Sequence, residues 1–425
     1  IRDRQHPFRR SIDEIFAGGC LVAARYLDPF RKLRTGFEET LALLGEWRRL
    51  DSANRRIAVC VGMSWWKRRR IADFVRSSAG TPPFRRGVAG ALRAARRAQA
   101  GGPAAIAAWA SRIPAGLAEA AAERGIRLIR VEDGFVRSVG LGSDFLPAAS
   151  LVFDASGMYF DPRRPSDLEI LLRETEFDAP LIERARRLAA QLVARGITKY
   201  NLDQRRPVRE ARPAWPEGVR RIFVPGQVED DLSVVLGGGD VRSNRDLLAR
   251  VRAANPAAFI LYKPHPDVAA GHRPGAIAPA LARQFADAVA EGGSTALLLG
   301  EIDEIHTISS LAGFEALLRR KRVVVYGRPF YAGWGLTEDR AALDRGRRLV
   351  LDELVAGALI LYPRYIDPVT RLPCGPELVI ERLADRELWR AGPVVLTRRL
   401  QGAVMRRWGG FAPRSGSRTA ERLLR

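Results

Sequence analysis

Short apolar runs alternate with longer stretches of helical periodicity along this chain, and this alternation restricts its possible folds more than any other feature. A short apolar run bounded by Gly, Pro or charged residues is typical of a buried strand, and an intervening helix allows consecutive strands to be parallel. Strands are expected at residues 56–61, 127–131, 150–154, 220–225, 258–263, 295–299, 305–308 and 322–326. The sequence therefore predicts an α/β protein with mostly parallel sheets.

The segments between these runs carry helical signals. Residues 38–50 have helical periodicity, and residues 87–125, rich in Ala and Arg, are expected to form helices broken at 101–103 and at Pro114. "RPSDLEILL" has Ser166 as the N-cap and Glu169 three residues later, a capping box that begins a helix expected to continue to about residue 196.

A proline-rich, charged segment divides the strands into two groups. Residues 202–218, "LDQRRPVREARPAWPEG", carry three prolines and are expected to be an interdomain linker. The predicted organisation is an N-terminal extension (1–54), a Rossmann-like domain (55–201), the linker, a second Rossmann-like domain (219–385) and a basic tail (386–425). Two such domains facing each other across a cleft form a GT-B-like architecture.

The charge of the chain is extreme for a protein of this kind. At 425 residues and 47% hydrophobic content it can bury the cores of two or three domains, yet its formal net charge is +22. Such a field attracts nucleic acid, anionic lipid or acidic sugar and nucleotide substrates. Only five of the basic residues are lysines. Because a bias toward arginine also follows from codon composition, the charge by itself does not identify a partner.

The cysteines and the hydropathy pattern exclude several classes of protein. Cys20, Cys60 and Cys374 are too far apart for a disulfide framework or a CxxC metal pattern, which fits a reducing cytoplasm. No apolar run is long enough for a membrane span, and no signal peptide is visible.

Polar side chains follow four of the predicted strands. Glu132 and Asp133 directly follow the run 127–131, and the other clusters are Gln227 with Glu229, Asp230 and Asp231, then Lys263 with His265 and Asp267, then Ser309 and Ser310 with Glu315. Ligands of open parallel sheets bind beyond the carboxyl ends of the strands. A single cluster would be ordinary, but four predict a ligand-binding cleft.

Two of these clusters suit a nucleotide. In "YKPHPD", Pro264 and Pro266 restrain the backbone around His265, so that an imidazole beside Lys263 is placed to bind a phosphate. The alternative is a proline-stiffened turn with a solvated histidine.

In "SSLAGFEALL", the hydroxyls of Ser309 and Ser310 precede a helix, a natural anion site, and Gly313 allows the backbone to approach a ligand. Glu315, one turn later, could accept hydrogen bonds from ribose hydroxyls. The alternative is an ordinary N-cap followed by a buried helix.

Familiar cofactor motifs are absent. No GxGxxG follows a strand, no Walker A sequence occurs, and no metal-ligand spacing rises above chance, so no cofactor and no metal are expected.

A nucleotide-binding second domain opposite a carboxylate-bearing first domain is the layout of a GT-B glycosyltransferase. An aspartate at the anomeric carbon of the donor would then act as nucleophile or base.

Several motifs resemble, in order, those of the KpsC/LipA capsule polysaccharide proteins, the retaining β-Kdo transferases of Gram-negative bacteria (Kdo is 3-deoxy-D-manno-oct-2-ulosonic acid). They are "EDGFVRSVGLGS" (132–143), "SLVFDASGMYFDPRRPSDLE" (150–169), "TKYN" (198–201), "VPGQVEDDLS" (224–233), "YKPHPD" (262–267), "SSLAGFEALL" (309–318) and "GRPFYAGWGLTED" (327–339). The resemblance covers about half of the chain. It implies a GT-B fold and transfer of Kdo from CMP-β-Kdo, with retention, to a lipid-linked or polysaccharide acceptor. Since members of this family usually carry two modules, the chain is expected to be a single-module relative or half of a longer protein.

The resemblance also implies roles for individual residues. Asp133 would be the nucleophile that forms a covalent Kdo adduct, with Glu132 supporting it, because retention by double displacement needs a carboxylate opposite the departing CMP. Lys263 and Pro266 lie in the family's HP motif, where His265 would contact the CMP phosphate.

The other predicted donor contacts have simpler roles. Ser309, Ser310 and Glu315 would hold the phosphate and ribose, and Gln227 and Glu229 would line the same mouth. Arg137 would pair with the carboxylate of Kdo, an expectation from charge complementarity.

The predicted partners follow from these roles. They are the donor CMP-Kdo, a Kdo-bearing glycolipid or glycan acceptor, and peripheral contact with the anionic inner membrane from the cytoplasm, for which the basic, aromatic-bearing tail is one candidate. A terminal helix packed on the domain is the alternative for that tail. No specific nucleic acid is expected, although a basic polyanion-binding protein stays the rival interpretation, as does a transferase of the same fold that uses another nucleotide sugar.

Overall fold

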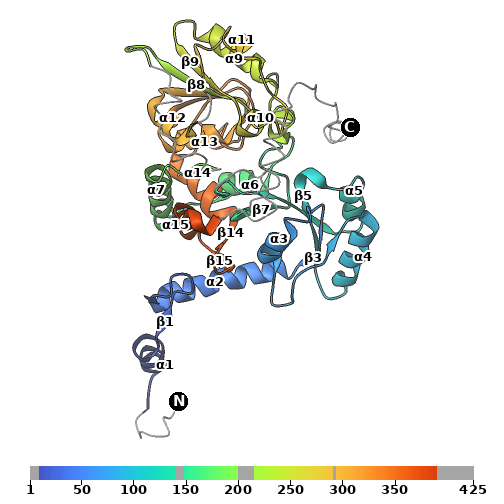
Figure 1. Cartoon of the computed structure of the whole chain (residues 1–425). Helices are drawn as coiled ribbons and strands as arrows, with labels where there is room; N and C mark the ends of the chain where they lie inside the picture. Colours follow the sequence, from blue (N-terminus) through green and yellow to red (C-terminus); the bar gives the residue numbers. More distant parts are fainter. Residues whose placement is uncertain (1–8, 139–147, 200–214, 291–292, 390–425) are drawn as a thin grey trace.

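A computed structural model describes residues 9–138, 148–199, 215–290 and 293–389 of the chain, which fold around two sheets (Figure 1). The first sheet has seven strands in the order β15-β14-β7-β6-β5-β3-β4, and the second has six in the order β10-β9-β8-β11-β12-β13. This mixed α/β architecture with parallel sheets confirms the predicted GT-B-like fold class. The predicted linker and tail lie almost entirely outside the described residues.

Four strands of the first sheet are parallel, and the rest are not. The parallel strands are β3 (Ile57–Val61), β4 (Phe84–Arg85), β5 (Ala105–Trp109) and β6 (Arg127–Asp133). The antiparallel additions are β7 (Ser150–Asp154), β14 (Pro363–Ile366) and β15 (Pro373–Cys374). Helices α3 (Arg68–Val75), α4 (Val88–Gln99) and α5 (Leu117–Ala122) connect the parallel strands.

The second sheet is parallel throughout. Its strands are β8 (Arg221–Pro225), β9 (Phe259–Lys263), β10 (Ala288–Val289), β11 (Glu304–Thr307), β12 (Arg322–Val325) and β13 (Glu338–Asp339). The helices between them are α8 (Leu232–Val235), α9 (Asn244–Ala254), α10 (Pro266–Ala269), α11 (Pro279–Ala282), α12 (Thr295–Glu301) and α13 (Leu311–Leu318). Because β8, β9 and β11 are adjacent and parallel, the groups that follow them meet at one edge.

The chain returns to the first sheet after leaving the second. Strand β14 pairs with β7, and α14 (Leu351–Val355) and α15 (Pro376–Ala384) contact α7 (Ala179–Ala194). The predicted second domain, 219–385, therefore differs from the sheet pairing, since residues 363–374 belong to the first sheet. This pairing buries Tyr365 and Ile366. The local sequence around these residues does not predict that they pair with the first sheet.

Two predicted elements are wrong. The apolar run 295–299, expected as a strand, is part of α12, because its Ala and Leu residues have high helix propensity, and Leu297 is 45% exposed. Conversely, the expected helical stretch 87–125 contains the strand β5. All five of its residues are buried between β3 and β6, where small alanines fit a strand covered on both faces.

The expected long helix after Ser166 is two helices. Helix α6 (Asp167–Glu174) begins with the Ser166 hydroxyl accepting from the Glu169 N–H at 3.1 Å, but the carboxylate of Glu169 pairs with Arg345 instead of completing the capping box. Helix α7 then begins separately at its N-cap Asp178.

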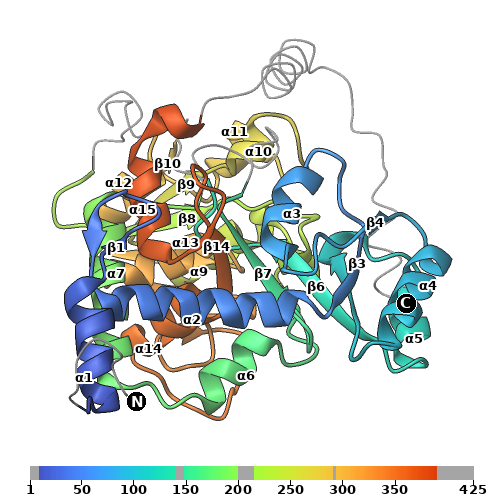
Figure 2. The same ribbon diagram turned by 90° about the horizontal axis from the view of Figure 1, so that it is seen from below.

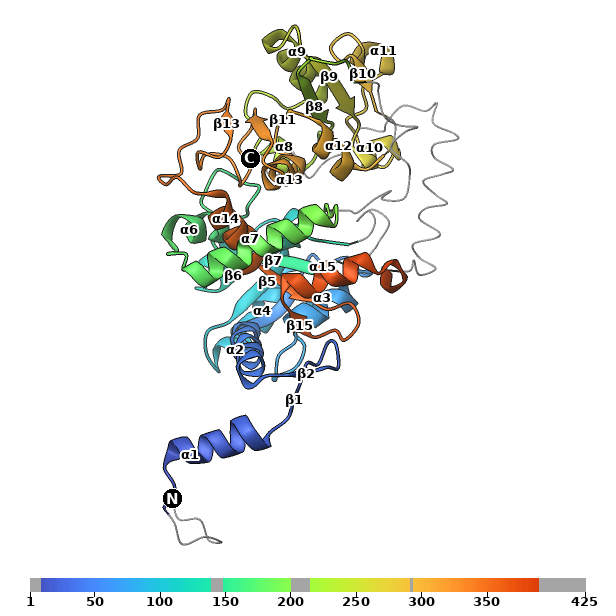
Figure 3. The ribbon, with the colours of Figure 1, turned by 90° about the vertical axis from the view of Figure 1, so that its left-hand side faces the viewer.

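The N-terminal segment forms an arm that reaches away from the two sheets (Figure 3). It consists of α1 (Ile12–Phe16), a π-helical turn (Ala17–Ala23), the short strands β1 (Tyr26–Leu27) and β2 (Arg34–Thr35), and α2 (Phe37–Asn54). Seen from below, α2 lies along the face of the molecule (Figure 2). Arg31 pairs with Glu381 of α15, and the Trp47 indole N–H donates to the carbonyl of Pro373 in β15, so these contacts hold the N-terminal segment to the first sheet and its last helix.

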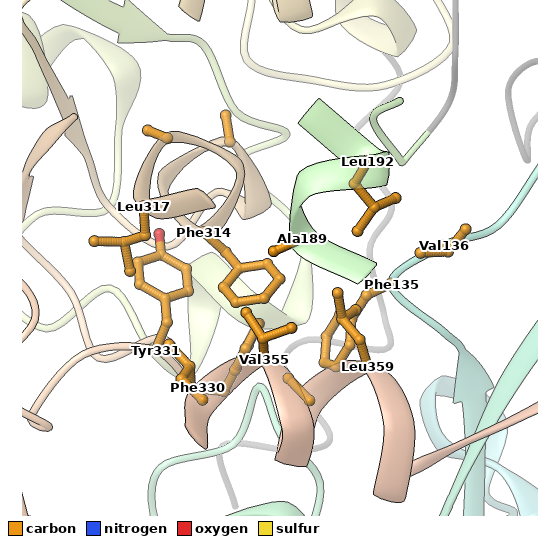
Figure 4. Packing of buried hydrophobic residues seen from close by; sticks show 14 of the residues in the cluster. Phe135, Val136, Ala189, Leu192, Phe314, Leu317, Phe330, Tyr331, Val355 and Leu359 are labelled. Atoms are coloured by element: carbon orange, nitrogen blue, oxygen red, sulfur yellow. The ribbon is translucent and has the colours of Figure 1, made fainter. Parts of the chain in front are cut away.

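A shared hydrophobic core joins the two halves (Figure 4). Phe135, just beyond β6, stacks on Phe330 with ring centroids 4.4 Å apart and also approaches Phe314 of α13. Close-packed aromatic side chains of this kind permit little relative movement. The core therefore holds the end of β6 against the carboxyl edge of the second sheet.

Candidate active site

A cleft of about 1180 Å³ lies between the two halves and is lined by both. It brings together most of the residues predicted from the sequence, namely Glu132, Asp133, Arg137, Gln227, Lys263, His265, Pro266, Ser309, Ser310 and Glu315. Glu229 and Gly313 do not line it. The clusters that follow β6, β8, β9 and β11 thus face a common space, as the strand pattern predicted.

The two carboxylates of the first half, Glu132 and Asp133, are the last residues of strand β6, before the chain bends at Gly134. The Gly134 N–H donates to the carbonyl of Ser150 at 3.0 Å, and a Cβ at this position would lie 2.8 Å from the Cβ of Ser150. Only glycine permits this approach of β6 to β7, which places Glu132 and Asp133 at the mouth of the cleft.

Asp133 is held by two cations. The Nε of Arg137 donates to its Oδ2 at 2.9 Å, and the Nζ of Lys67 lies 3.3 Å from Oδ2 and 3.4 Å from Oδ1. Arg137 is itself only 1% exposed and also donates to the Ser138 hydroxyl. Burial alone would raise the pKa of Asp133, but Arg137 and Lys67 overcome that effect and hold the pKa well below its usual range.

Glu132 lies in a different electrostatic environment. Burial raises its pKa to about 7, an effect that the charge of Lys67 only partly offsets, and its carboxylate accepts from the backbone N–H of Asp133 at 3.0 Å. Adjacent carboxyls with pKa values pushed apart can take different chemical roles at one pH. Asp133 is ionised at neutral pH, whereas Glu132 can exchange a proton.

Lys67 is a site residue that the sequence analysis did not find. It precedes α3 in "MSWWKRRR", and its Nζ lies 3.6 Å from the centroid of the Trp109 ring at the end of β5. Its position after β3 was the available signal, since β3, β5 and β6 are neighbours in the sheet. The surrounding arginine run concealed that signal.

Gln227 organises the carboxyl edge of the second sheet. Its Oε1 accepts from the Thr307 hydroxyl at 2.9 Å and from the backbone N–H groups of Ile308 and Ser309 at 3.0 and 3.1 Å, while its Nε2 donates to the Ser309 hydroxyl. These bonds connect β8 to the turn after β11. The side chain therefore supports the position of Ser309 in the cleft.

Glu229 has a structural role that the sequence did not suggest. Its Oε1 accepts from the backbone N–H of Asn244 at 2.8 Å, and Asn244 in turn exchanges hydrogen bonds with the backbone of Gln227. This network places Glu229 at the beginning of α9, outside the lining of the cleft.

His265 is fixed at the N-cap of α10. Its Nδ1 accepts from the backbone N–H of Asp267 at 3.1 Å, which leaves the proton of a neutral imidazole on Nε2, and Pro266 follows at the first helical position. Burial lowers the pKa of His265. In this residue, which lines the cleft, a neutral ring therefore carries its donor at Nε2.

Lys263 and Glu315 line the floor of the cleft. The Nζ of Lys263 donates to the Gly293 carbonyl at 2.6 Å and to the Thr295 hydroxyl at 3.1 Å. Glu315 accepts from the backbone N–H of Lys199 at 2.8 Å, and burial raises its pKa to about 7. A buried carboxyl of this kind can accept or donate a hydrogen bond at neutral pH.

The serines and Gly313 have distinct environments at the start of α13. Ser310 is the N-cap, and its hydroxyl accepts from the Ala312 N–H at 3.2 Å. Gly313 faces Tyr331, whose hydroxyl donates to the Ser310 carbonyl, and a Cβ on Gly313 would lie 2.8 Å from Cζ of that ring. Contrary to the prediction, the small residue accommodates a tyrosine rather than a ligand.

The described residues include no group of three or more His, Cys, Asp or Glu side chains arranged to hold a metal ion. Within the same ranges, no helix is both long and apolar enough to cross a membrane.

The cleft has an ionised carboxylate and a proton-exchanging carboxyl on one side, with Lys263, His265 and serine hydroxyls on the other. These groups suit a sugar that is joined to a phosphate leaving group.

Sequence comparison finds the same family that the motifs resemble. Residues 104–201 and 185–365 match the family described as capsule polysaccharide biosynthesis protein. The capsule polysaccharide modification protein LipA of Neisseria meningitidis serogroup B is 40% identical over 380 residues, which are 89% of this chain and 53% of LipA. The lipopolysaccharide-processing protein LpsZ of Rhizobium meliloti is 48% identical over 244 residues, 56% of this chain and 54% of LpsZ. The chain therefore spans about half the length of the curated relatives it matches.

Two solved structures of KpsC from Thermosulfurimonas dismutans are similar to this chain. The β Kdo 2,7 transferase superposes with a TM-score of 0.60 at 34% identity and covers 77% of this chain and 99% of its own. The β Kdo 2,4 transferase gives a TM-score of 0.63 at 31% identity, with 77% and 98% covered. The similarity thus extends over 77% of this chain.

Proposed function

Since this chain belongs to the family of capsule polysaccharide biosynthesis proteins, we propose that it is a glycosyltransferase that moves Kdo from CMP-β-Kdo to a lipid-linked or polysaccharide acceptor. The observation that carries the proposal is an ionised carboxylate, Asp133, in one cleft with the Lys263 and His265 cluster of the opposite sheet. The two similar KpsC structures are both of β Kdo transferases, and this supports the choice of sugar.

The proposed reaction is a double displacement with Asp133 as the nucleophile. A carboxylate oxygen of Asp133 attacks the anomeric carbon of Kdo, the bond from that carbon to the phosphate oxygen breaks, and its electron pair leaves with CMP. An acceptor hydroxyl then attacks the same carbon, the ester to Asp133 breaks, and the carboxylate is restored. Two inversions at one carbon give net retention.

Glu132 is the proposed proton acceptor of the second step. The acceptor hydroxyl must lose a proton as it attacks, and a general base works best with a pKa near the working pH. The pKa of Glu132, raised to about 7, meets that condition, whereas the strongly acidic Asp133 does not. The first step needs no acid, because the phosphate of CMP is a stable leaving group.

The second sheet is the proposed donor site. The Nε2–H of His265 and the ammonium of Lys263 would stabilise the phosphate as CMP departs, and Ser309 and Ser310 would contribute hydroxyls. Glu315 would contact the ribose. Gln227 and Glu229 would act indirectly, by holding Ser309 and the start of α9.

Arg137 has a modified role in this proposal. It was predicted to pair with the carboxylate of Kdo, but its Nε–H is already bound to Asp133 and its guanidinium is almost fully buried. Its proposed function is therefore to keep Asp133 ionised and oriented. A contact with the Kdo carboxylate would have to use its remaining N–H groups.

The proposed setting is the cytoplasmic face of the inner membrane, where a lipid-linked acceptor would be reached by peripheral contact. The basic residues 390–425, suggested for that contact, lie outside the described residues. Nucleic-acid binding is not proposed, since the net charge is the single feature that favours it.

The decisive experiment is incubation with CMP-Kdo and a panel of Kdo-bearing lipids and glycans, followed by NMR of the product linkage. A β-linked Kdo product, and thermal stabilisation by CMP but not by UDP or GDP, are expected. Stabilisation by UDP or GDP in place of CMP would assign the chain to another nucleotide sugar. A shift of random DNA that survives moderate salt would favour the polyanion-binding alternative.

A further inference from the structure

The cation of Lys67 lies beside the reacting carboxylates, yet the reaction proposed above does not use it. Its Nζ is almost equally far from the two oxygens of Asp133, at 3.3 and 3.4 Å, and its side chain is 16% exposed. The residue comes from the loop after β3, 66 positions earlier in the chain than Asp133. It thus joins the two strands that flank β5.

A lysine in this position is costly to bury and is held by an unusual set of contacts. Burial lowers its pKa, and the carboxylates of Asp133 and Glu132 oppose that effect. The ring face of Trp109, 3.6 Å away, provides a second favourable site for the ammonium, and Trp66 lies further off at 5.3 Å. Removing either carboxylate would leave a buried cation with a weaker partner.

Arg137 and Lys67 contact Asp133 differently. The Nε–H of Arg137 donates to Oδ2, whereas the ammonium of Lys67 lies between both oxygens. A carboxylate held by a directed hydrogen bond at one oxygen and a bridging cation at both can rotate little about its χ2 torsion. Such preorganisation keeps one oxygen available to a reacting carbon.

We propose that Lys67 is a positioning residue at the end of β6, where it holds the carboxylate of Asp133 in the orientation for attack and supplies the positive charge next to Glu132. This inference rests on the proposed function, because it assigns Lys67 a part in the same reaction. Titratable groups that interact with Glu132 include Lys67 from the loop after β3, Asp133 on its own strand, Tyr159 after β7 and Lys199 after α7. Among them, Lys67 exerts the strongest charge effect and keeps the pKa of Glu132 from rising further.

The inference has a readout that does not need turnover. With glutamate-selective ¹³C labelling, the carboxyl signal of Glu132 is identified by its loss in Glu132→Gln, and its titration is then followed in the wild type and in Lys67→Met. The midpoint is expected near 7 in the wild type and at higher pH in Lys67→Met, because a stabilising positive charge has been removed. An unchanged midpoint would overturn the proposal.

Kinetics with CMP-Kdo provide the second readout. In Lys67→Met, kcat is expected to fall by about 10²-fold, the usual effect of removing one preorganised electrostatic group, and the acidic limb of the pH–rate profile should move to higher pH. Lys67→Arg, which keeps the charge, should restore part of the rate. A kcat equal to that of the wild type, with the limb unmoved, would show that Lys67 has no positioning role.

Controls separate this inference from the proposed function and from misfolding. Lys321→Met removes a half-buried lysine whose Nζ donates to the Gly300 carbonyl, away from the cleft, and should change neither readout. If Lys67→Met gives little folded protein, Lys67→Gln is measured in its place, since its polar side chain keeps a hydrogen-bond donor without the charge. A wild type that turns over no CMP-Kdo would refute the proposed function, while the titration of Glu132 would still decide the inference about Lys67.

Discussion

Replacing Glu315 by Gln should change the stability of this protein in a strongly pH-dependent way. Glu315 is buried on α13, 8% exposed, and its Oε1 accepts from the backbone N–H of Lys199. Burial raises its pKa from the ordinary 4.5 to about 7, despite the opposing effects of that hydrogen bond and of nearby cations. A Gln side chain has the same shape and can accept the same hydrogen bond without ionising.

The size of the effect follows from proton linkage. A carboxyl whose pKa is higher in the folded than in the unfolded state favours folding fully below the unfolded pKa, and this contribution is lost as the pH rises through the folded pKa. At 1.36 kcal/mol per pKa unit, a rise from 4.5 to about 7 corresponds to about 3 kcal/mol. As the pH rises from about 4.5 to about 7.5, the free energy of unfolding of Glu315→Gln should therefore increase by about 3 kcal/mol relative to that of the wild type.

Urea denaturation of both proteins across this pH range measures the difference in the free energy of unfolding. Effects of Glu132 and of other titrating groups are common to both proteins and cancel in that difference. Glu174→Gln on α6, where the carboxylate is 62% exposed and pairs with Arg173, is the matched control and should change the free energy of unfolding by less than about 1 kcal/mol. A pH-independent difference for Glu315→Gln would refute the reasoning, because it would mean that the folded protein does not perturb this carboxyl.

Other substitutions test the catalytic carboxylate and the packing that positions it. Asp133→Asn should lower the rate of transfer by at least about 10³-fold, while the affinity for CMP, measured by calorimetry, is retained. Substantial turnover by this variant would contradict the proposed role of Asp133. The absence of a Kdo adduct from intact-mass spectra of the trapped wild type would contradict it as well. Phe135→Ala should cost about 3–5 kcal/mol in chemical denaturation, since the ring stacks on Phe330 across the two halves, and a loss below about 1 kcal/mol would contradict a close-packed junction. Gly313→Ala should destabilise the protein by about 1–3 kcal/mol because its Cβ would meet the Tyr331 ring. The matched Gly300→Ala in α12, where a Cβ would have no neighbour within 4 Å, should be neutral or stabilising.

Much of the site could be anticipated because its residues follow strands. The apolar runs before Asp133, Gln227, Lys263 and Ser309 each end at the carboxyl side of a strand, so parallel pairing alone brings the polar groups to a common edge. The roles within that edge were less predictable. Gln227 and Glu229 are similar polar residues two positions apart. Gln227 supports Ser309 in the cleft, whereas Glu229 accepts a hydrogen bond from the backbone N–H of Asn244 at the start of α9. Which way a side chain turns depends on neighbours that lie far away in the sequence.

The sequence by itself determined the local elements and the edge at which the chemistry gathers, because strand and helix periodicity and capping residues act within a few positions of one another. The alanine-rich strand β5 shows the limit of such signals, since its conformation depends on burial between β3 and β6 rather than on propensity. Only the tertiary structure decided that β14 returns to pair with β7, and that Lys67 and Arg137 meet at Asp133 while Glu132 keeps a pKa near neutrality. Those properties arise from burial and from charges brought together across the sheet, and neither is present until the chain has folded.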